Sequence, residues 1–273
     1  MFTSDTHMHT LYSHHGEGTV DQLCRSALAK GFDLIAITEH LTLPDFEDPE
    51  RHYSMAPEEQ PIYIEQIEEA RALYPRLRIL CGCEVDWRQG EAALQWIDQW
   101  SEPFQIKLGS VHMVPDDKGN SRPFDSPGNP EVWQELGPDE VWRRYFRLWQ
   151  DAAASHRFDI MSHPDLPKKL GFYPSFDLGP YYQQMAQTAA AADVLVEVNT
   201  SGLRYKVGEM YPNPELLREF NQAGVGCAIG SDAHDPALVG ADFDKGYQLL
   251  RDCGYREITV PLGGGERKHI ALG

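Results

Sequence analysis

The segment LRILCGCEVD (77–86) is an almost continuous apolar run that ends on acidic residues. Six further runs of similar length lie at 3–9, 33–38, 105–112, 158–163, 194–199 and 225–230. Strands that are apolar on both faces are typical of parallel sheets, because helices cover both sides of such a sheet. The pattern therefore predicts a parallel sheet built from these seven runs.

Segments of helical periodicity separate the runs, near 19–30, 58–73, 91–100, 138–156, 178–192, 213–223 and 241–252. Seven strand–helix units in 273 residues favour an α/β fold, a closed TIM-like (β/α)7 barrel that forms a single domain over residues 1–273. An open doubly wound sheet is the alternative. The irregular stretches 41–57 and 113–137 each follow a strand. Both should therefore lie at the C-terminal rim, where barrel enzymes build their active sites.

Composition restricts the class of protein. Hydrophobic residues make up 41% of the chain, which is enough for a sizeable core. A net charge of −18 and a pI of about 4.9 make nucleic acid and anionic membranes poor partners. No apolar run approaches the roughly 20 residues of a membrane helix, and the first residues lack the features of a signal peptide.

The five irregularly spaced cysteines are expected to be buried free thiols in a reducing cytoplasm. The run Gly263-Gly264-Gly265 is interpreted as part of a tail.

Histidines and acids recur where the predicted strands end. His7 and His9 follow the first run, and Asp232 and His234 follow the last, each pair at a spacing that places both side chains on one face of a strand. Imidazole and carboxylate ligands suit Zn²⁺, Mn²⁺ or Fe²⁺. A single strand-end histidine is more often a hydrogen-bonded rim residue than a ligand. Six such endings in one topological place instead favour a metal centre, since many unpaired ionisable groups would be costly to bury.

The successive motifs resemble those of the PHP (polymerase and histidinol phosphatase) superfamily, in matching order from His7 to His234. They are DTHMHT (5–10), ITEH (37–40), the lone Glu84, GSVH (109–112), SHPD (162–165) and GSDAH (230–234). The segments FDIMSHPDLPKKLGF (158–172) and VEVNTSGLRYKVGEMYPNPELL (196–217) are similar to the stand-alone histidinol-phosphate phosphatases of that superfamily. The resemblance implies a distorted seven-stranded βα barrel with two to three divalent metal ions at its C-terminal rim.

The resemblance also implies how the ligands divide. The first metal ion would be held by His7, His9, Glu84 and Asp232; Glu84 would bridge to a second ion completed by His112 and His163; the third would be held by His15, His40 and His234. His14 is the alternative to His15, and Glu39 is expected to orient a ligand histidine. The remaining histidines, His52, His156 and His269, are expected to be ordinary surface or helix residues.

The resemblance further implies a phosphomonoesterase in which hydroxide bridging two metal ions attacks phosphorus, with catalytic roles for Glu84, Asp232, His234 and Arg204. Arg204 and Lys206, after the sixth strand, are candidates to bind the substrate phosphate, and Lys168 and Lys169 are weaker ones. The implied substrate is L-histidinol phosphate, in histidine biosynthesis. Acids of the two irregular stretches could face the cationic leaving group: Asp45, Glu47, Asp48, Asp116, Asp117 and Asp125.

Four other functions remain alternatives. The same metal centre could accept another small phosphomonoester or a nucleotide. An amidohydrolase-like deaminase or amidase also begins with a His-x-His strand, but it usually closes with a lone aspartate and lacks the bridging position of Glu84. A DNA exonuclease of the same superfamily is disfavoured by the net charge of −18. A non-enzymatic metal-dependent binding protein would leave an open metal cluster unexplained.

Overall fold

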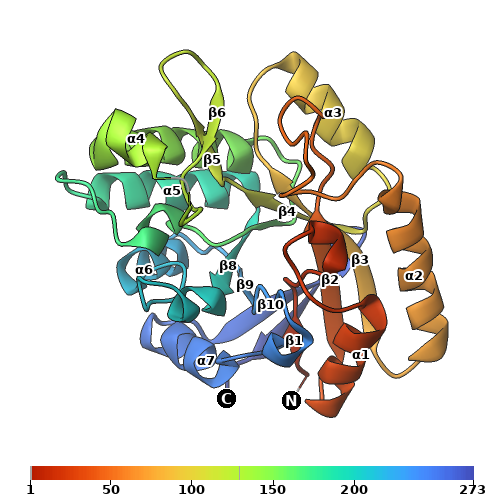
Figure 1. The fold of residues 1–273 in the computed structure, drawn as a ribbon. Helices are drawn as coiled ribbons and strands as arrows, with labels where there is room; N and C mark the ends of the chain where they lie inside the picture. Colours follow the sequence, from red (N-terminus) through yellow and green to blue (C-terminus); the bar gives the residue numbers. More distant parts are fainter. Residues whose placement is uncertain (1, 129) are drawn as a thin grey trace.

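A parallel sheet of seven strands forms the centre of the computed structural model, which describes residues 2–128 and 130–273 (Figure 1). Neighbouring strands follow one another in chain order and all pair in parallel. They are β1 (Ser4–Asp5), β2 (Leu34–His40), β3 (Arg78–Asp86), β4 (Ile106–Ser110), β7 (Ile160–Met161), β8 (Leu195–Asn199) and β9 (Cys227–Gly230). The predicted α/β barrel is confirmed, and an open doubly wound sheet is not formed.

Helices surround the sheet, and Figure 1 shows both termini at the same end of the molecule. They are α1 (Val20–Ala29), α2 (Glu59–Leu73), α3 (Glu91–Ser101), α4 (Glu131–Ala154), α5 (Gly179–Ala192), α6 (Pro214–Gln222) and α7 (Phe243–Asp252). Local sequence fixes several of their ends. The Thr19 side chain accepts a hydrogen bond from Gln22 N while Gln22 caps Thr19 N in return, and Asn213 caps α6.

A seam between β1 and β9 nearly closes the sheet into a barrel. Beyond the two-residue β1, the chain from Thr6 to His9 runs beside the chain that follows β9. Thr6 N donates to Ile229 O at 3.2 Å, His9 N to Ala233 O at 2.8 Å, and Asp232 N to His7 O at 2.8 Å. The two ends of the sheet therefore meet where the predicted ligands lie.

The interior is one contiguous cluster of apolar side chains that extends from the sheet to all seven helices. The alternation of apolar strands and amphipathic helices produces this arrangement, since each strand buries both faces. All five cysteines are buried and free, as predicted. Among the described residues, no helix has both the length and the apolar character required to cross a membrane.

Three details differ from the sequence prediction. The stretch 113–137 contains a small hairpin of β5 (Met113–Pro115) and β6 (Ser121–Pro123), and α4 already begins at Glu131, with a break at Gly137 before Pro138. The glycine run 263–265 ends β10 (Glu257–Gly263) and forms the turn into β11 (Glu266–Ala271), so it belongs to a hairpin and is not part of a tail. All three glycines have positive φ, a conformation that glycine adopts without a steric penalty.

Candidate metal centre

Four predicted ligand atoms converge at the seam between β1 and β9. His7 Nε2 and His9 Nε2 are 3.1 Å apart, and Glu84 Oε2 lies 3.2 Å from the first and 3.3 Å from the second. Asp232 Oδ1 lies 3.7 Å from His7 Nε2 and 3.5 Å from His9 Nε2. Ligand atoms around a tetrahedral Zn²⁺ are separated by about 3.3 Å. The spacing of this group, called group A below, therefore fits one metal ion.

The other oxygen of Glu84 belongs to a second group, called group B. Glu84 Oε1 lies 2.7 Å from His163 Nε2 and 3.5 Å from His112 Nε2, and the two ring nitrogens are 3.2 Å apart. Glu84 is 1% exposed and lies on β3, between β2 and β4. One carboxylate thus presents one oxygen to each group, which is the arrangement of a bridging metal ligand.

The third predicted group, called group C, is less tightly assembled. His15 Nε2 lies 3.1 Å from His234 Nε2, but the His40 ring centre is 5.1 Å from that of His15, and His40 Nδ1 faces Glu84 Oε2 at 3.3 Å. His9, His40 and His234 also place one ligand atom each within the reach of one metal ion. His14 turns away, because its Nε2 lies 2.8 Å from Glu59 Oε2, which favours His15 as the ligand.

Three carboxylates contact the Nδ1 atoms of predicted ligand histidines. His7 Nδ1 lies 2.9 Å from Glu197 Oε1, His112 Nδ1 lies 2.8 Å from Asp86 Oδ1, and His9 Nδ1 lies 3.4 Å from Glu39 Oε1. A proton on each Nδ1 leaves Nε2 free to bind a metal, so these acids fix both the tautomer and the ring orientation. Glu39 takes the position predicted for it.

Sequence reasoning did not predict a role for Glu197, which lies on the sixth strand of the sheet, β8. Besides its bond to His7, its Oε2 accepts from His163 N at 2.9 Å and from Asn199 Nδ2 at 3.0 Å. Gly230 makes room for it: a Cβ there would lie 2.0 Å from Glu197 Oε1 and 2.6 Å from His7 Cβ. An acid placed two residues before Asn199 on a buried strand was the available signal.

The histidines of the site form two classes, one with a raised pKa and one with a lowered pKa. Burial lowers the pKa of His7 and His9, but neighbouring carboxylates more than compensate and raise both well above the usual value. Glu197 has the largest raising effect on His7, followed by Glu84 and Asp232, whereas Asp232, Glu39 and Glu84 raise the pKa of His9. Burial, with the neighbouring His9, lowers the pKa of His234 to about 3 and that of His40 well below its usual value. Although burial opposes ionisation of Glu84, the surrounding histidines hold its pKa well below the usual range. Neutral imidazole and ionised carboxylate are the forms that bind metals.

Arg204 lies directly behind group A. Its Nη2 donates to the backbone oxygens of Ser231 at 2.7 Å and Asp232 at 3.1 Å. Its Nη1 is buried and has no acceptor among the residues that the structure describes. An unpaired buried N–H of a guanidinium is costly, and an oxygen of a bound anion would satisfy it.

The three lysines considered as phosphate ligands differ in burial and in their partners. Lys168 is fully buried, with Nζ 2.7 Å from Met210 O and 3.1 Å from Asp165 Oδ2, so it supports the fold and is not a phosphate ligand. Lys206 is exposed and lies 6.0 Å from the centre of the Phe172 ring. No contact among the described residues places it at the metal groups. Its assignment to phosphate therefore stays a prediction without support from the structure.

Lys169 differs from both of these lysines, because it pairs with an acid near the metal groups. Its Nζ lies 2.8 Å from Asp125 Oδ2 and 4.4 Å from the centre of the Tyr205 ring. Burial would lower its pKa, but Asp125 and Tyr205 raise it, with Asp232 adding to the effect, so the side chain stays cationic. This places a permanent positive charge beside the metal groups.

The acids of the irregular loops mostly have structural partners. Asp45 pairs with Arg51, Glu47 with Arg88 and Asp117 with Arg144. The remaining pair, Asp48 and Asp116, accept backbone bonds within their own loops. Only Asp125 also influences the pKa of a ligand, His112. The three other histidines lie outside the ligand groups: His52 and His269 pair with Glu50 and Glu257, and His156 follows α4.

Known proteins share both sequence and fold with this chain. A family model described as PHP domain matches residues 5–201. The chain is 32% identical over 262 residues to the "Probable histidinol-phosphatase" of Deinococcus radiodurans, covering 93% of this chain and 95% of that protein. It is 28% identical over 259 residues to the "Histidinol-phosphatase" of Bacillus subtilis, covering 88% of this chain and 96% of that protein. The crystal structure of a Lactococcus lactis histidinol phosphate phosphatase, complexed with zinc, L-histidinol and phosphate, superposes with a TM-score of 0.76 at 21% identity and covers 97% of this chain and 98% of that chain.

Proposed function

Because the chain belongs to the PHP domain family, we propose that it is a metal-dependent phosphomonoesterase, a single domain over residues 1–273, that hydrolyses L-histidinol phosphate to L-histidinol and phosphate. The observation that carries the proposal is the carboxylate of Glu84, which has one oxygen in group A and the other in group B. The names of the relatives support the choice of substrate.

The residues present fit divalent ions. Three pairs of imidazole nitrogens face each other at 3.1–3.2 Å, namely His7 with His9, His112 with His163, and His15 with His234. In the ion-free chain a proton can bridge such a pair, and a bound cation would take the place of that proton, because metal ligation requires an unprotonated nitrogen. We assign two to three ions of Zn²⁺, Mn²⁺ or Fe²⁺ to groups A, B and C. Such ions, when bound, activate water at neutral pH and neutralise phosphate charge.

The chain itself binds and orients the ester. Arg204 Nη2 donates to the backbone oxygens of Ser231 and Asp232, which holds the Nη1 amino group, without an acceptor among the described residues, beside group A. We assign this donor to a phosphate oxygen. Lys169, close to Asp232 and cationic, is the second positive group that we assign to the phosphate. Both charges are fixed before the substrate arrives, which lowers the reorganisation cost in the transition state.

The acidic character of the rim suits a cationic leaving group. Asp125 stays ionised, because Lys169 and the histidines of group B lower its pKa against the opposing effect of burial. It lies at the side of group B and carries the negative charge that a leaving group with an ammonium and an imidazole would meet. This supports histidinol phosphate over sugar phosphates and nucleotides, whose leaving groups lack such a cation.

The test is a comparison of kcat/KM across phosphomonoesters with the metal-loaded full chain. L-histidinol phosphate should exceed glucose 6-phosphate, AMP and p-nitrophenyl phosphate by at least about tenfold, or about 1.4 kcal/mol of transition-state binding. Glu84→Ala should remove activity toward all four compounds, because it dismantles groups A and B together, while the barrel stays folded. A flat profile would leave only a general phosphomonoesterase. No hydrolysis of any of them would overturn the proposal.

A further inference from the structure

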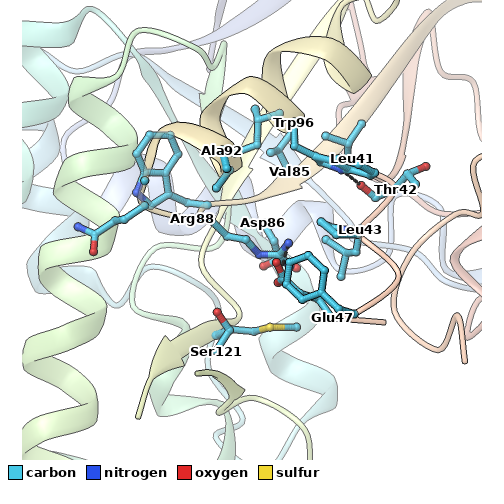
Figure 2. Close-up of a pocket in the computed structure, with 18 of the residues that line it drawn as sticks. Leu41, Thr42, Leu43, Glu47, Val85, Asp86, Arg88, Ala92, Trp96 and Ser121 are labelled. Carbon is cyan, nitrogen blue, oxygen red and sulfur yellow. Dashed lines mark hydrogen bonds and ion pairs between the residues drawn. The ribbon is translucent and has the colours of Figure 1, made fainter. Parts of the chain in front are cut away.

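A cavity of about 1180 Å³ lies at the C-terminal rim, outside the metal centre (Figure 2). Three segments enclose it: the loop after β2, the end of β3 with the first turn of α3, and the β5–β6 hairpin. Asp86 separates it from group B, since this residue lines the cavity and its Oδ1 binds His112 Nδ1 at 2.8 Å. The cavity is therefore a neighbour of the metal centre and not part of it.

One wall of the cavity is apolar. Leu41, Leu43 and Val85 line it together with Trp96, whose indole N–H donates to Thr42 O at 2.8 Å. That bond holds the indole ring in place and leaves its carbon face as a fixed surface. Figure 2 shows these side chains on one side of the hollow. Such a wall stabilises an aliphatic or aromatic group of a ligand.

The cavity lining also contains a buried guanidinium, that of Arg88, with donors that lack an acceptor among the described residues. The Arg88 side chain is 10% exposed, and its Nη1 forms an ion pair with Glu47 Oε2 at 2.7 Å. Its Nε and Nη2 are buried and have no acceptor among residues 2–128 and 130–273. These two atoms form the edge of a guanidinium that binds a carboxylate with two parallel hydrogen bonds. The structure thus contains a donor pair without its acceptor.

A helix N-terminus adds to the same preference for an anion. The residues that open α3, from Gln89 to Ala93, line the cavity next to Arg88. Gly90, at φ +100°, precedes the helix and no side chain caps it. The first N–H groups of a helix have no partner within the helix and carry a partial positive charge. Arg88 and the start of α3 therefore offer donors to one negatively charged group.

From these observations we infer that the cavity is a second ligand site, which binds a small monocarboxylate with an apolar body. The carboxylate would meet the Nε–Nη2 edge of Arg88 and the start of α3, and the body would pack on Trp96 and the leucines. The acids Asp45, Glu47, Asp86 and Glu91 also line the cavity, so a phosphate dianion would meet more repulsion than a single negative charge. The site is independent of the proposed phosphatase activity.

The experiment is calorimetric titration of the metal-loaded full chain with three probes. They are 3-phenylpropionate, 2-phenylethylamine, which lacks the carboxylate, and inorganic phosphate, which lacks the apolar body. Each titration is repeated on the chelator-treated chain, because binding at the metal centre requires the ions and binding in the cavity does not.

Two variants locate the site: Arg88→Met removes the donors, and Ala92→Phe fills the cavity from an exposed position on α3. Gln95→Phe, exposed on the same helix and absent from the cavity lining, is the matched control.

We expect 3-phenylpropionate to bind with and without metal, and both cavity variants to weaken it at least tenfold while Gln95→Phe leaves it unchanged. Should Arg88→Met unfold, Ala92→Phe alone decides the question, since its side chain adds volume without removing a buried contact. The inference is overturned if 3-phenylpropionate does not bind, if its binding disappears with the ions, if Ala92→Phe has no effect, or if 2-phenylethylamine binds equally well.

Discussion

Replacing Gly230 with alanine would place a methyl group where the Glu197 carboxylate meets His7. The added Cβ would lie 2.0 Å from Glu197 Oε1 and 2.6 Å from His7 Cβ, well inside van der Waals contact. Glu197 is fully buried and cannot rotate into solvent. Relief of the clash must therefore displace Glu197, His7 or both. Gly230→Ala tests whether this carboxylate orients a metal ligand.

Two effects with different magnitudes should follow. The extra atom in a packed interior should lower the free energy of unfolding by about 1–3 kcal/mol. Displacement of Glu197 should break its 2.9 Å contacts with His7 Nδ1 and with His163 N, which belong to groups A and B. Loss of such a supporting carboxylate typically weakens metal binding by about 10–100-fold. Metal affinity should therefore fall by more than the stability change of the ion-free chain alone would produce.

The assay is zinc competition against a chromophoric chelator, run beside urea unfolding of the chelator-treated chain. Gly128→Ala is the matched control, because a Cβ at Gly128 would meet no atom within 4 Å and its φ is not positive. The control should leave both measurements unchanged. Zinc affinity of Gly230→Ala within twofold of the parent chain would refute the role given to Glu197, even if the variant were less stable.

Three further outcomes are expected. The purified chain should hold two to three divalent ions by elemental analysis, and chelation should abolish phosphatase activity that Mn²⁺ or Zn²⁺ restores; one ion or fewer under replete conditions would contradict groups A, B and C. Arg204→Ala should lower kcat/KM for a phosphomonoester by about 10–150-fold, the loss of one charge-assisted contact of about 1.5–3 kcal/mol, and an unchanged value would assign the phosphate to another cation. Lys168→Met should lower the free energy of unfolding by about 3–5 kcal/mol, because it leaves Asp165 buried without its cationic partner. The metal content should stay the same. A urea midpoint equal to that of the parent chain would show that the buried pair does not contribute to stability.

The barrel could be predicted because its signals are local. Most central strands are apolar runs followed by a helical segment, so the number of strands follows from the sequence pattern, although β1 (Ser4–Asp5) is polar. The hairpin of β5 and β6 could not be predicted. Each of its strands has three residues and ends on a proline, Pro115 and Pro123, so the sequence shows no alternation.

The ligand groups were partly predictable for the same reason. Residues at the carboxyl ends of parallel strands meet at one rim, which brings His7, Glu84 and Asp232 together whatever the loops do. The lysines show the limit of this reasoning. Lys168 and Lys169 are adjacent in a 3-10 turn (Leu166–Leu170), and only the course of that turn sends one toward Met210 O and the other toward Asp125. Glu197 depends similarly on the space left by Gly230 in the next strand.

The seam between β1 and β9 gives group A a role in the connectivity of the chain. His7 and His9 follow the first strand of the sheet and Asp232 follows the last, so an ion bound there would act as a cross-link that closes almost the whole polypeptide into one loop. Closing so long a loop reduces the entropy of the unfolded chain in the same way as a disulfide, by about 5 kcal/mol for a loop of this length. Because all cysteines of the chain are free, the ion would provide the cross-link that a disulfide bond provides in other proteins. Amide exchange across the seam, at Thr6, His9 and Asp232, would then be the first to accelerate when the ion leaves.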